Sequence, residues 1–237
     1  MNKGLYHSAS AILTLTKNLN VKTQNIANVN TVGYKYDNYH NKTFQEVYLS
    51  YKNENLGKIP SKIGVDSVET VFTQGTFIST ERSLDLAISG TGFFKIDMGD
   101  GTYAYTRNGS IKIDTEGFLT DDNGHYLLGN NGRIQLESLK NLSIKKDGSI
   151  YSNGKYIDKI NTYDIENPRK LGNSYFKSTA ETISNSEIYQ GYLENSNTDI
   201  GKELTDVIVL QRYMTSNHKM LQAQDELNKR MIDNLIK

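Results

Sequence analysis

Apolar residues recur at a spacing of seven near the start of the chain. Leu5, Ile12, Leu19 and Ile26 occupy one such series, and mostly polar or small residues stand between them. A spacing of seven places side chains in one narrow row along a helix, as in a coiled coil, and we call this row a seam. The pattern predicts an N-terminal helix, with Gly33 as the expected stop a little beyond its end.

The C-terminal region shows the same spacing. The positions of this second seam are occupied by Ile200, Val207, Met214, Leu221, Asn228 and Leu235. Neither Gly nor Pro interrupts the chain after Gly201, so the pattern predicts a helix of roughly 50 Å. One reading is an amphipathic helix packed on its own domain. The matching seam at the other end favours a second reading, in which the two ends pair with each other or with neighbouring copies.

The region between the helices has a different pattern of apolar and turn-forming residues. From Phe93 onward, short strand-like runs alternate with turn signals such as Asn108-Gly109, Asn123-Gly124 and Asn153-Gly154, which favour hairpins. Asp147-Gly148 is of the same kind. Turns about every 8–12 residues predict an antiparallel all-β module.

Residues 36–90 give a weaker signal. The run FQEVYLSYK suits either a helix end or a strand, ENLGKIPSKIG is loop-like, and VETVFTQGTF alternates like a strand. We therefore expect an α+β protein with these parts: an N-terminal helix in 1–35, an extended connecting segment with some strands in 36–90, a central β domain in 91–190 and a C-terminal helix in 191–237. The two helices are expected to pair in a coiled-coil-like inner domain.

Composition narrows the classes of function. The 237 residues include 27 Lys and Arg against 27 Asp and Glu and no Cys. A balanced charge argues against a nucleic-acid binder, and no window reaches the ~18 apolar residues of a membrane span. The first residues lack the apolar run of a secretory signal peptide. The expectation is either a cytoplasmic protein or one exported without cleavage.

No pattern indicates catalysis, a cofactor or a metal. Gly90-Thr91-Gly92 precedes a strand-like run and lacks the third glycine and the helix of a dinucleotide loop. The run Asp121–Gly124 lacks the spaced acids of a calcium loop and suits a hairpin turn. The four histidines are scattered. We expect no enzymatic activity and no small-molecule substrate.

Longer motifs resemble a known family. LYHSASAILTLTKNLNVKTQNIANVNTVGYK is similar to the N-terminal signature of bacterial flagellar rod and hook proteins, which ends in an ANVNT-x-G-[FY]-K run. GYLENSNTDIGKELTDVIVLQRYMTSNHK resembles the family's C-terminal end, where a LExSNVD turn leads into a helix. FTQGTF, LDLAISGTGFF and YTRNGS resemble central motifs of the rod subgroup.

The residues of this chain that match the two terminal motifs are Asn25, Asn28, Asn30, Gly33, Tyr34, Lys35, Asn195, Asn197, Asp199, Glu203, Gln211, Arg212 and Asn217. The chain departs from the family pattern at Ala11, where Gly is usual, and at Val32, where Thr or Pro is common. Glu81-Arg82-Ser83 stands in place of a typical Gly-Asn-Pro. These departures blur the subtype and leave the family resemblance intact.

The resemblance implies a structural subunit of the flagellar basal-body rod, proximal or distal, that assembles helically and transmits torque. It implies contacts with identical subunits, with other rod and hook proteins and with the flagellar export apparatus, in an extracytoplasmic location reached without a cleaved signal peptide. We also interpret the Asn-rich joints as fixing how the inner helices leave the tube and touch adjacent subunits, with Gly33 making the bend. Alternatives are a hook or other axial protein of the family, or a non-flagellar β-rich binding module with a coiled-coil stalk.

Overall fold

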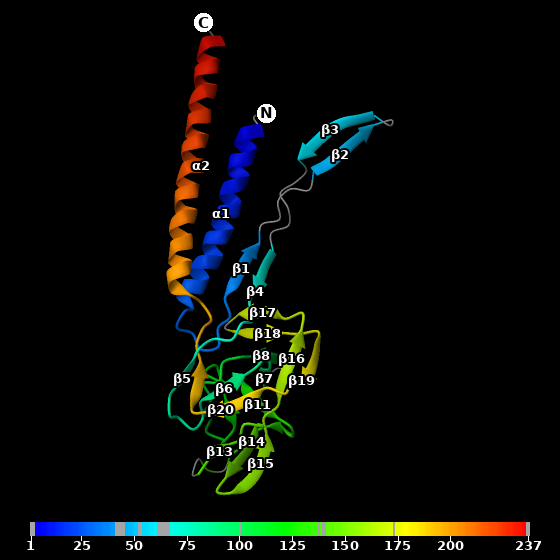
Figure 1. Cartoon of the computed structure of the whole chain (residues 1–237), viewed down its shortest axis with the longest axis vertical. Helices are drawn as coiled ribbons and strands as arrows, with labels where there is room; N and C mark the ends of the chain where they lie inside the picture. The colour runs from blue at the N-terminus through cyan, green and yellow to red at the C-terminus, as the bar shows by residue number, and fades with distance from the viewer. Residues whose placement is uncertain are drawn as a thin grey trace. The chain divides into compact units, whose positions relative to one another are not determined.

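The computed structural model describes residues 3–40, 46–51, 54–60, 67–99, 101–136, 138, 141–172 and 174–235, with side chains except those of 3–7, 46–51, 54–60, 232, 234 and 235. The chain divides into two compact units (Figure 1). The helical unit comprises Met1–Ala27, Asp37–Thr70 and Asp199–Lys237, and the β unit comprises Asn28–Tyr36 and Val71–Thr198. The chain therefore passes between the units at 27–28, 36–37, 70–71 and 198–199.

Two helices form the main part of the helical unit. α1 (Lys3–Ala27) and α2 (Ile200–Leu235) lie side by side and run in opposite directions (Figure 1). Contacts between Lys22 and Glu203, and between Ser8 and Met220, follow this antiparallel order. Asp199 caps α2, since its Oδ1 accepts hydrogen bonds from two backbone N–H groups of the first turn.

Strands complete the helical unit. β1 (Asp37–His40) pairs antiparallel with β4 (Ser67–Thr70), and β2 (Glu46–Tyr51) pairs with β3 (Glu54–Pro60). The run FQEVYLSYK therefore falls mainly in a strand. The loop-like interpretation of ENLGKIPSKIG is wrong for its first seven residues, because the backbone pairing with β2 outweighs a composition rich in turn residues.

The β unit is built around one antiparallel sheet of ten strands among the described residues. The path runs β17-β18-β8-β7-β11-β10-β9; β16 also pairs with β7, β19 with β16, and β12 with β11. These strands are β7 (Phe93–Asp97), β8 (Tyr103–Thr106), β9 (Lys112–Ile113), β10 (Leu119–Thr120), β11 (Tyr126–Gly129), β12 (Gly132–Arg133), β16 (Thr162–Glu166), β17 (Arg169–Gly172), β18 (Tyr175–Lys177) and β19 (Ala180–Ile183).

Smaller sheets cover the rest of this unit. β13 (Ser143–Ile144), β14 (Ser149–Ser152) and β15 (Lys155–Lys159) form a three-stranded sheet. β6 (Leu86–Ser89) pairs with β20 (Glu187–Gln190), and β5 (Phe77–Ser79) pairs with β21 (Tyr192–Glu194). The apolar core gathers side chains from several of these elements, including Leu86, Ile88, Phe94, Ile150 and Ile188.

The predicted hairpin dipeptides did not all become hairpins. Asn153 and Gly154 both have positive φ and join β14 to β15, as the sequence indicated. Asn108-Gly109 is not a hairpin. The backbone of Gly109 instead lies against Leu86, and a Cβ at this glycine would lie 1.7 Å from the Leu86 carbonyl oxygen. Because Gly109 has no side chain, it allows two segments that are distant in sequence to approach each other closely.

The fold class is thus α+β, with a mostly antiparallel β region and two terminal helices that pack together. The N-terminal helix ends at Ala27, and Asn28–Tyr36 belong to the β unit. The same unit takes in Val71 onward, so part of the segment expected to be connecting structure contributes strands to it.

Candidate functional site

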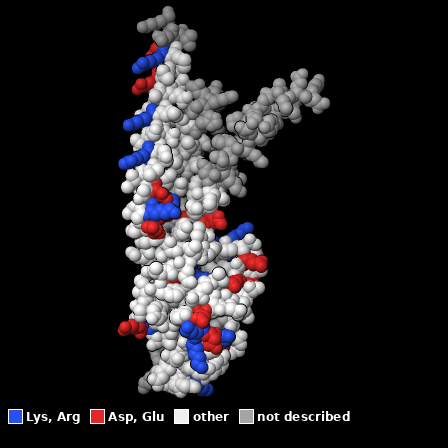
Figure 2. Space-filling view, viewed as in Figure 1, with Lys and Arg blue, Asp and Glu red and all other residues white. Residues whose placement is uncertain are grey.

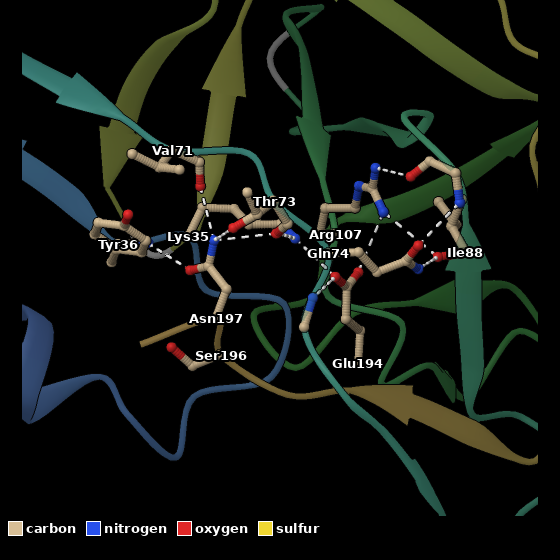
Figure 3. Close-up of polar contacts among 12 residues, drawn as sticks. Lys35, Tyr36, Val71, Thr73, Gln74, Ile88, Arg107, Glu194, Ser196 and Asn197 are labelled. Atoms are coloured by element: carbon tan, nitrogen blue, oxygen red, sulfur yellow. Dashed lines mark hydrogen bonds and ion pairs between the residues drawn. The ribbon is translucent and has the colours of Figure 1, made fainter. Parts of the chain in front are cut away.

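A buried charge cluster joins the two terminal motifs inside the β unit (Figure 3). Lys35 Nζ lies 2.7 Å from Glu194 Oε1, and Arg107 Nη1 lies 3.2 Å from Glu194 Oε2. None of the three side chains is more than 1% exposed. Lys35 comes from the N-terminal motif, Glu194 from the C-terminal one and Arg107 from the central YTRNGS run. We call these three residues the β-unit cluster.

Glu194 is shared between the two cations. Its Oε1 also accepts a hydrogen bond from the Gly75 backbone at 2.8 Å. Burial lowers the pKa of Lys35, and nearby Arg107 lowers it further, while Glu194 opposes both effects. Burial likewise lowers the pKa of Arg107, again against Glu194. One carboxylate therefore offsets much of the desolvation of two buried cations.

Backbone carbonyl groups accept further hydrogen bonds from the cluster, although Arg107 Nε is buried without a partner among the described residues. Lys35 donates to the Thr73 carbonyl at 2.8 Å. Arg107 donates to the carbonyl groups of Ile88 and Gly90. These bonds tie the cluster to the segment that precedes β5 and to the C-terminal end of β6, so the three side chains act as a fixed support for several strands.

Asn197 makes a second connection between the terminal motifs (Figure 3). Its Oδ1 accepts from the Tyr36 backbone N–H at 2.9 Å, and its Nδ2 donates to the carbonyl groups of Val71 and Thr73. One amide thus bridges two segments that continue into the helical unit, at 36–37 and 70–71, and one segment that leads to α2.

Gly33 is required by a close approach in addition to its turn geometry. Its φ is +66°, and a Cβ at this position would lie 2.4 Å from the carbonyl carbon of Arg107. Its N–H donates to the carbonyl of Glu194 at 2.8 Å. The glycine lies six residues past the end of α1, so its place in the structure is beside the β-unit cluster.

A second charged cluster lies at the base of the helix pair. Lys22 contacts Glu203 at 3.1 Å and Asp206 at 2.9 Å, and Asn25 Nδ2 donates to Glu203 at 3.1 Å. Asn25 also exchanges hydrogen bonds with the backbone of Asp37 in β1. Burial lowers the pKa of Lys22, but hydrogen bonds to Asp206 and Glu203 outweigh it, so the net pKa is raised. We call these residues the helix-base cluster.

The seam residues with described side chains occupy the half-buried face of the helix pair. They are Ile12, Leu19, Ile26, Val207, Met214 and Leu221. The side chains of Leu5 and Leu235 lie outside the described residues. Leu210 is more deeply buried than any of these, and Ile200, at the first seam position of α2, is exposed.

The other motif residues do not converge on one place. Asn28 accepts hydrogen bonds from Thr31 in the turn after α1. Asn195 pairs with Thr76 beside β5 and Asp199 caps α2. The remaining members differ in burial: Tyr34 is buried, Asn217 is half-buried, and Asn30, Gln211 and Arg212 are exposed.

Sequence reasoning missed the partners of the motif residues. Arg107 and Lys22 lie within the quoted motif runs, but nothing in those runs indicated that the two cations are buried. A second apolar row on α2 was also missed. Tyr213, Met220 and Leu227 recur at a spacing of seven and are 58–61% exposed. That spacing was a signal available in the sequence.

The described residues contain no group of three His, Cys, Asp or Glu side chains placed to hold a metal ion. Among the same residues, no helix is long and apolar enough to cross a membrane. Each unit therefore contains one buried charged cluster of its own.

Three family models match separate parts of the chain. "Flagella basal body rod protein" matches residues 5–35, "Flagellar hook protein FlgE/F/G D1 domain" matches 87–152, and "Flagellar basal body rod FlgEFG protein C-terminal" matches 189–234. The β-unit cluster takes one residue from each of these segments.

Curated proteins match along nearly the whole chain. Flagellar basal-body rod protein FlgG of Bacillus subtilis (strain 168) is 31% identical over 98% of this chain and 99% of its own length. FlgF of Caulobacter vibrioides is 31% identical over 99% and 98%. FlgG of Borreliella burgdorferi is 30% identical over 96% of each chain.

Proposed function

We propose, from the premise that this chain belongs to the flagellar basal-body rod protein family, that it builds the rod by packing its terminal helices against those of neighbouring copies. The chain is a structural subunit of the basal-body rod. The proposal concerns the means of assembly: a coiled-coil-like inner layer made of α1 and α2, with torque carried through many repeated contacts.

The observation that carries the proposal is the pair of apolar rows on α2. Val207, Met214 and Leu221 are half-buried in the helix pair. Each residue of the second row directly precedes a seam position, and one residue corresponds to 100° around an α-helix. The helix therefore presents the seam to α1 and leaves most of the second row exposed, although Met220 Sδ accepts a hydrogen bond from Ser8 of α1.

Two more exposed apolar residues extend the second row. Val209 and Met231 extend it at the two ends, and both are exposed. Figure 2 shows basic side chains, with some acidic ones among them, along one edge of α2 and uncharged surface beside them. Burying such apolar area contributes roughly 25 cal/mol per Å², and contacts that do not close between identical chains yield a helical assembly.

The two buried clusters suit a part that must carry load. The helix-base cluster holds α1, α2 and β1 together, and the β-unit cluster holds the two terminal motifs to the sheet. Each cluster would then hold the segments of its own unit together under torque. The Asn-rich joints contribute Asn25 and Asn197 to this support, and Asn28 accepts hydrogen bonds from Thr31 in the turn after α1.

Rod membership places the chain in the flagellar basal body and implies assembly with other rod and hook subunits. We further propose an extracytoplasmic position in the cell envelope, reached through the flagellar export apparatus. Relatives named FlgG and FlgF match at similar identity, so the proposal extends to either section of the rod. A hook or other axial role is the second candidate, since one matching family model carries the hook protein's name.

A seam substitution tests the proposed assembly. In cells whose only copy carries Leu221→Asp, isolated basal bodies should lack the rod and the cells should not swim, because a charge enters the helix pair. The purified variant should keep its β-sheet circular dichroism. Gln222→Asp places the same charge on an exposed position and should leave motility unchanged. Normal rods with Leu221→Asp would overturn the proposal.

A further inference from the structure

Two strands at the rim of the β unit have an open edge. Among the described residues β5 pairs with β21 alone, and β19 pairs with β16 alone. Figure 1 shows β5 and β19 on opposite sides of the β unit. An exposed strand edge carries unpaired backbone groups and is a ready template for another strand.

The backbone pattern says which residues of β5 face outward. Asn195 donates to the Thr76 carbonyl and Thr80 donates to the Gly191 carbonyl, so Thr76, Ile78 and Thr80 bond toward β21. Peptide groups alternate direction along an antiparallel ladder. The N–H and C=O groups of Phe77 and Ser79 therefore point to the open edge.

The open edge of β5 carries apolar side chains. Phe77 is 37% and Ile78 48% exposed. Aromatic rings continue from Phe77 to Tyr189, 6.1 Å between centroids, and from Tyr189 to Tyr192, 6.5 Å. Lys146 and Glu187 pair beside them as a polar rim. Exposed aromatics with a polar rim are typical of protein interfaces.

The strands of this surface are anchored to the buried parts of the β unit. β21 ends at Glu194, the central carboxylate of the β-unit cluster, and β20 contributes the buried Ile188 to the core. The edge is therefore held in place before any partner arrives, which reduces the ordering cost of binding.

The edge of β19 offers a matching pair of residues. The Ser184 N–H donates to the Thr162 carbonyl, so the alternation points the backbone groups of Glu181 and Ile183 away from β16. All four β19 residues are exposed, and Ile183 is 69% exposed. Each edge thus presents two outward residues separated by one position.

We propose that the β5 edge of one copy pairs antiparallel with the β19 edge of a second copy, with Phe77 opposite Ile183 and Ser79 opposite Glu181. This register brings an aromatic and a β-branched side chain together, a favourable cross-strand pair. A parallel register would set Phe77 against Glu181. The inference rests on the proposed function, because it adds a contact between β units to the helical assembly.

The contact uses different edges on the two partners. It is therefore heterologous, and such contacts continue from copy to copy without closing on a dimer. A rod needs this property. An isologous pairing of two β5 edges would instead stop at two chains.

Disulfide trapping tests the pairing in assembled rods. The chain has no Cys, so introduced thiols have no native competitor. Facing residues in an antiparallel pair lie about 5.5 Å apart at Cα, within the 4.4–6.8 Å that a disulfide spans. Rods carrying both Ser79→Cys and Glu181→Cys should give, on mild oxidation, a ladder of covalent dimers, trimers and longer chains. Mixed rods of the two single variants should give dimers only.

The control pair is Tyr103→Cys with Tyr156→Cys, both at exposed positions of the same unit. It should give no ladder. Rods that form normally but show no Ser79–Glu181 ladder, or an equal ladder from the control pair, would overturn the proposed contact. A chain that forms no rods even without substitutions would contradict the proposed function instead.

Discussion

Lys35 and Glu194 lie 159 positions apart and form a 2.7 Å ion pair in which neither side chain is exposed to solvent. The pair joins the motif that follows α1 to the motif that precedes α2. Arg107 completes it from the centre of the chain. Three sequence motifs that look independent along the chain are therefore parts of one support.

Removing the carboxylate should be costly. Glu194→Gln leaves Lys35 and Arg107 as buried cations without an acidic partner, and we expect a loss of about 3–5 kcal/mol in the free energy of unfolding. Urea unfolding followed by β-sheet circular dichroism measures it. Glu187→Gln, at an exposed site, should change stability by less than about 0.5 kcal/mol. Similar losses for the two variants would show that the buried pair has no special role.

Gly33 should not tolerate a side chain. Gly33→Ala combines the left-handed φ of +66° with a Cβ 2.4 Å from backbone carbon. Gly154→Ala has a similar φ of +77° and open space around the Cβ, so it should lose only the roughly 1–2 kcal/mol of the conformation itself. Thermal unfolding should show a clearly larger loss for Gly33→Ala. Equal losses would mean that the close approach relaxes freely.

Glu81 stands where the resembling family typically has Gly, and its φ is +58°. Glu81→Gly should therefore stabilise the β unit by about 1 kcal/mol, because the left-handed conformation is unfavourable for residues with a Cβ. Glu116→Gly, at an exposed turn position without a positive φ, should destabilise slightly. Denaturant midpoints compare the two variants, and a loss of stability for Glu81→Gly would contradict the backbone argument.

The contribution of Lys22 to folding stability should be lost at high pH. Its pKa is raised above 10.5 in the folded chain, so its stabilising contribution is complete below pH 10.5 and is lost as pH rises through the folded pKa. Stability should fall less steeply in this range for Lys22→Met than for the unsubstituted chain. Lys219→Met, on the exposed face of α2, should leave the slope unchanged. Parallel curves for Lys22→Met and the unsubstituted chain would refute the assignment.

The helices were predictable because their apolar spacing is regular and long. Val207, Met214 and Leu221 recur at seven and lie on the half-buried face, and hairpins such as Asn153-Gly154 carry their geometry in two adjacent residues. Both signals are local. The family resemblance rested on similar short runs, and the comparisons bear out the rod family.

The partners of the motif residues could not be predicted in the same way. Arg107 meets Glu194 only because the β unit folds one segment against another 87 positions away. A buried cation looks like any surface cation in a sequence, since its burial depends on tertiary packing. The hairpin prediction at Asn108-Gly109 was wrong for the same reason. The dipeptide suits a hairpin, but the backbone of Leu86 lies against Gly109.

The central claim is that α2 packs against its own α1 mainly through the seam and against a neighbouring copy through the second row. A helical reconstruction of assembled rods by electron cryomicroscopy tests it most directly. The account predicts that Tyr213, Met220 and Leu227, exposed in the single chain, are covered by a helix of an adjacent subunit. Rods in which this row faces solvent along its length would contradict it.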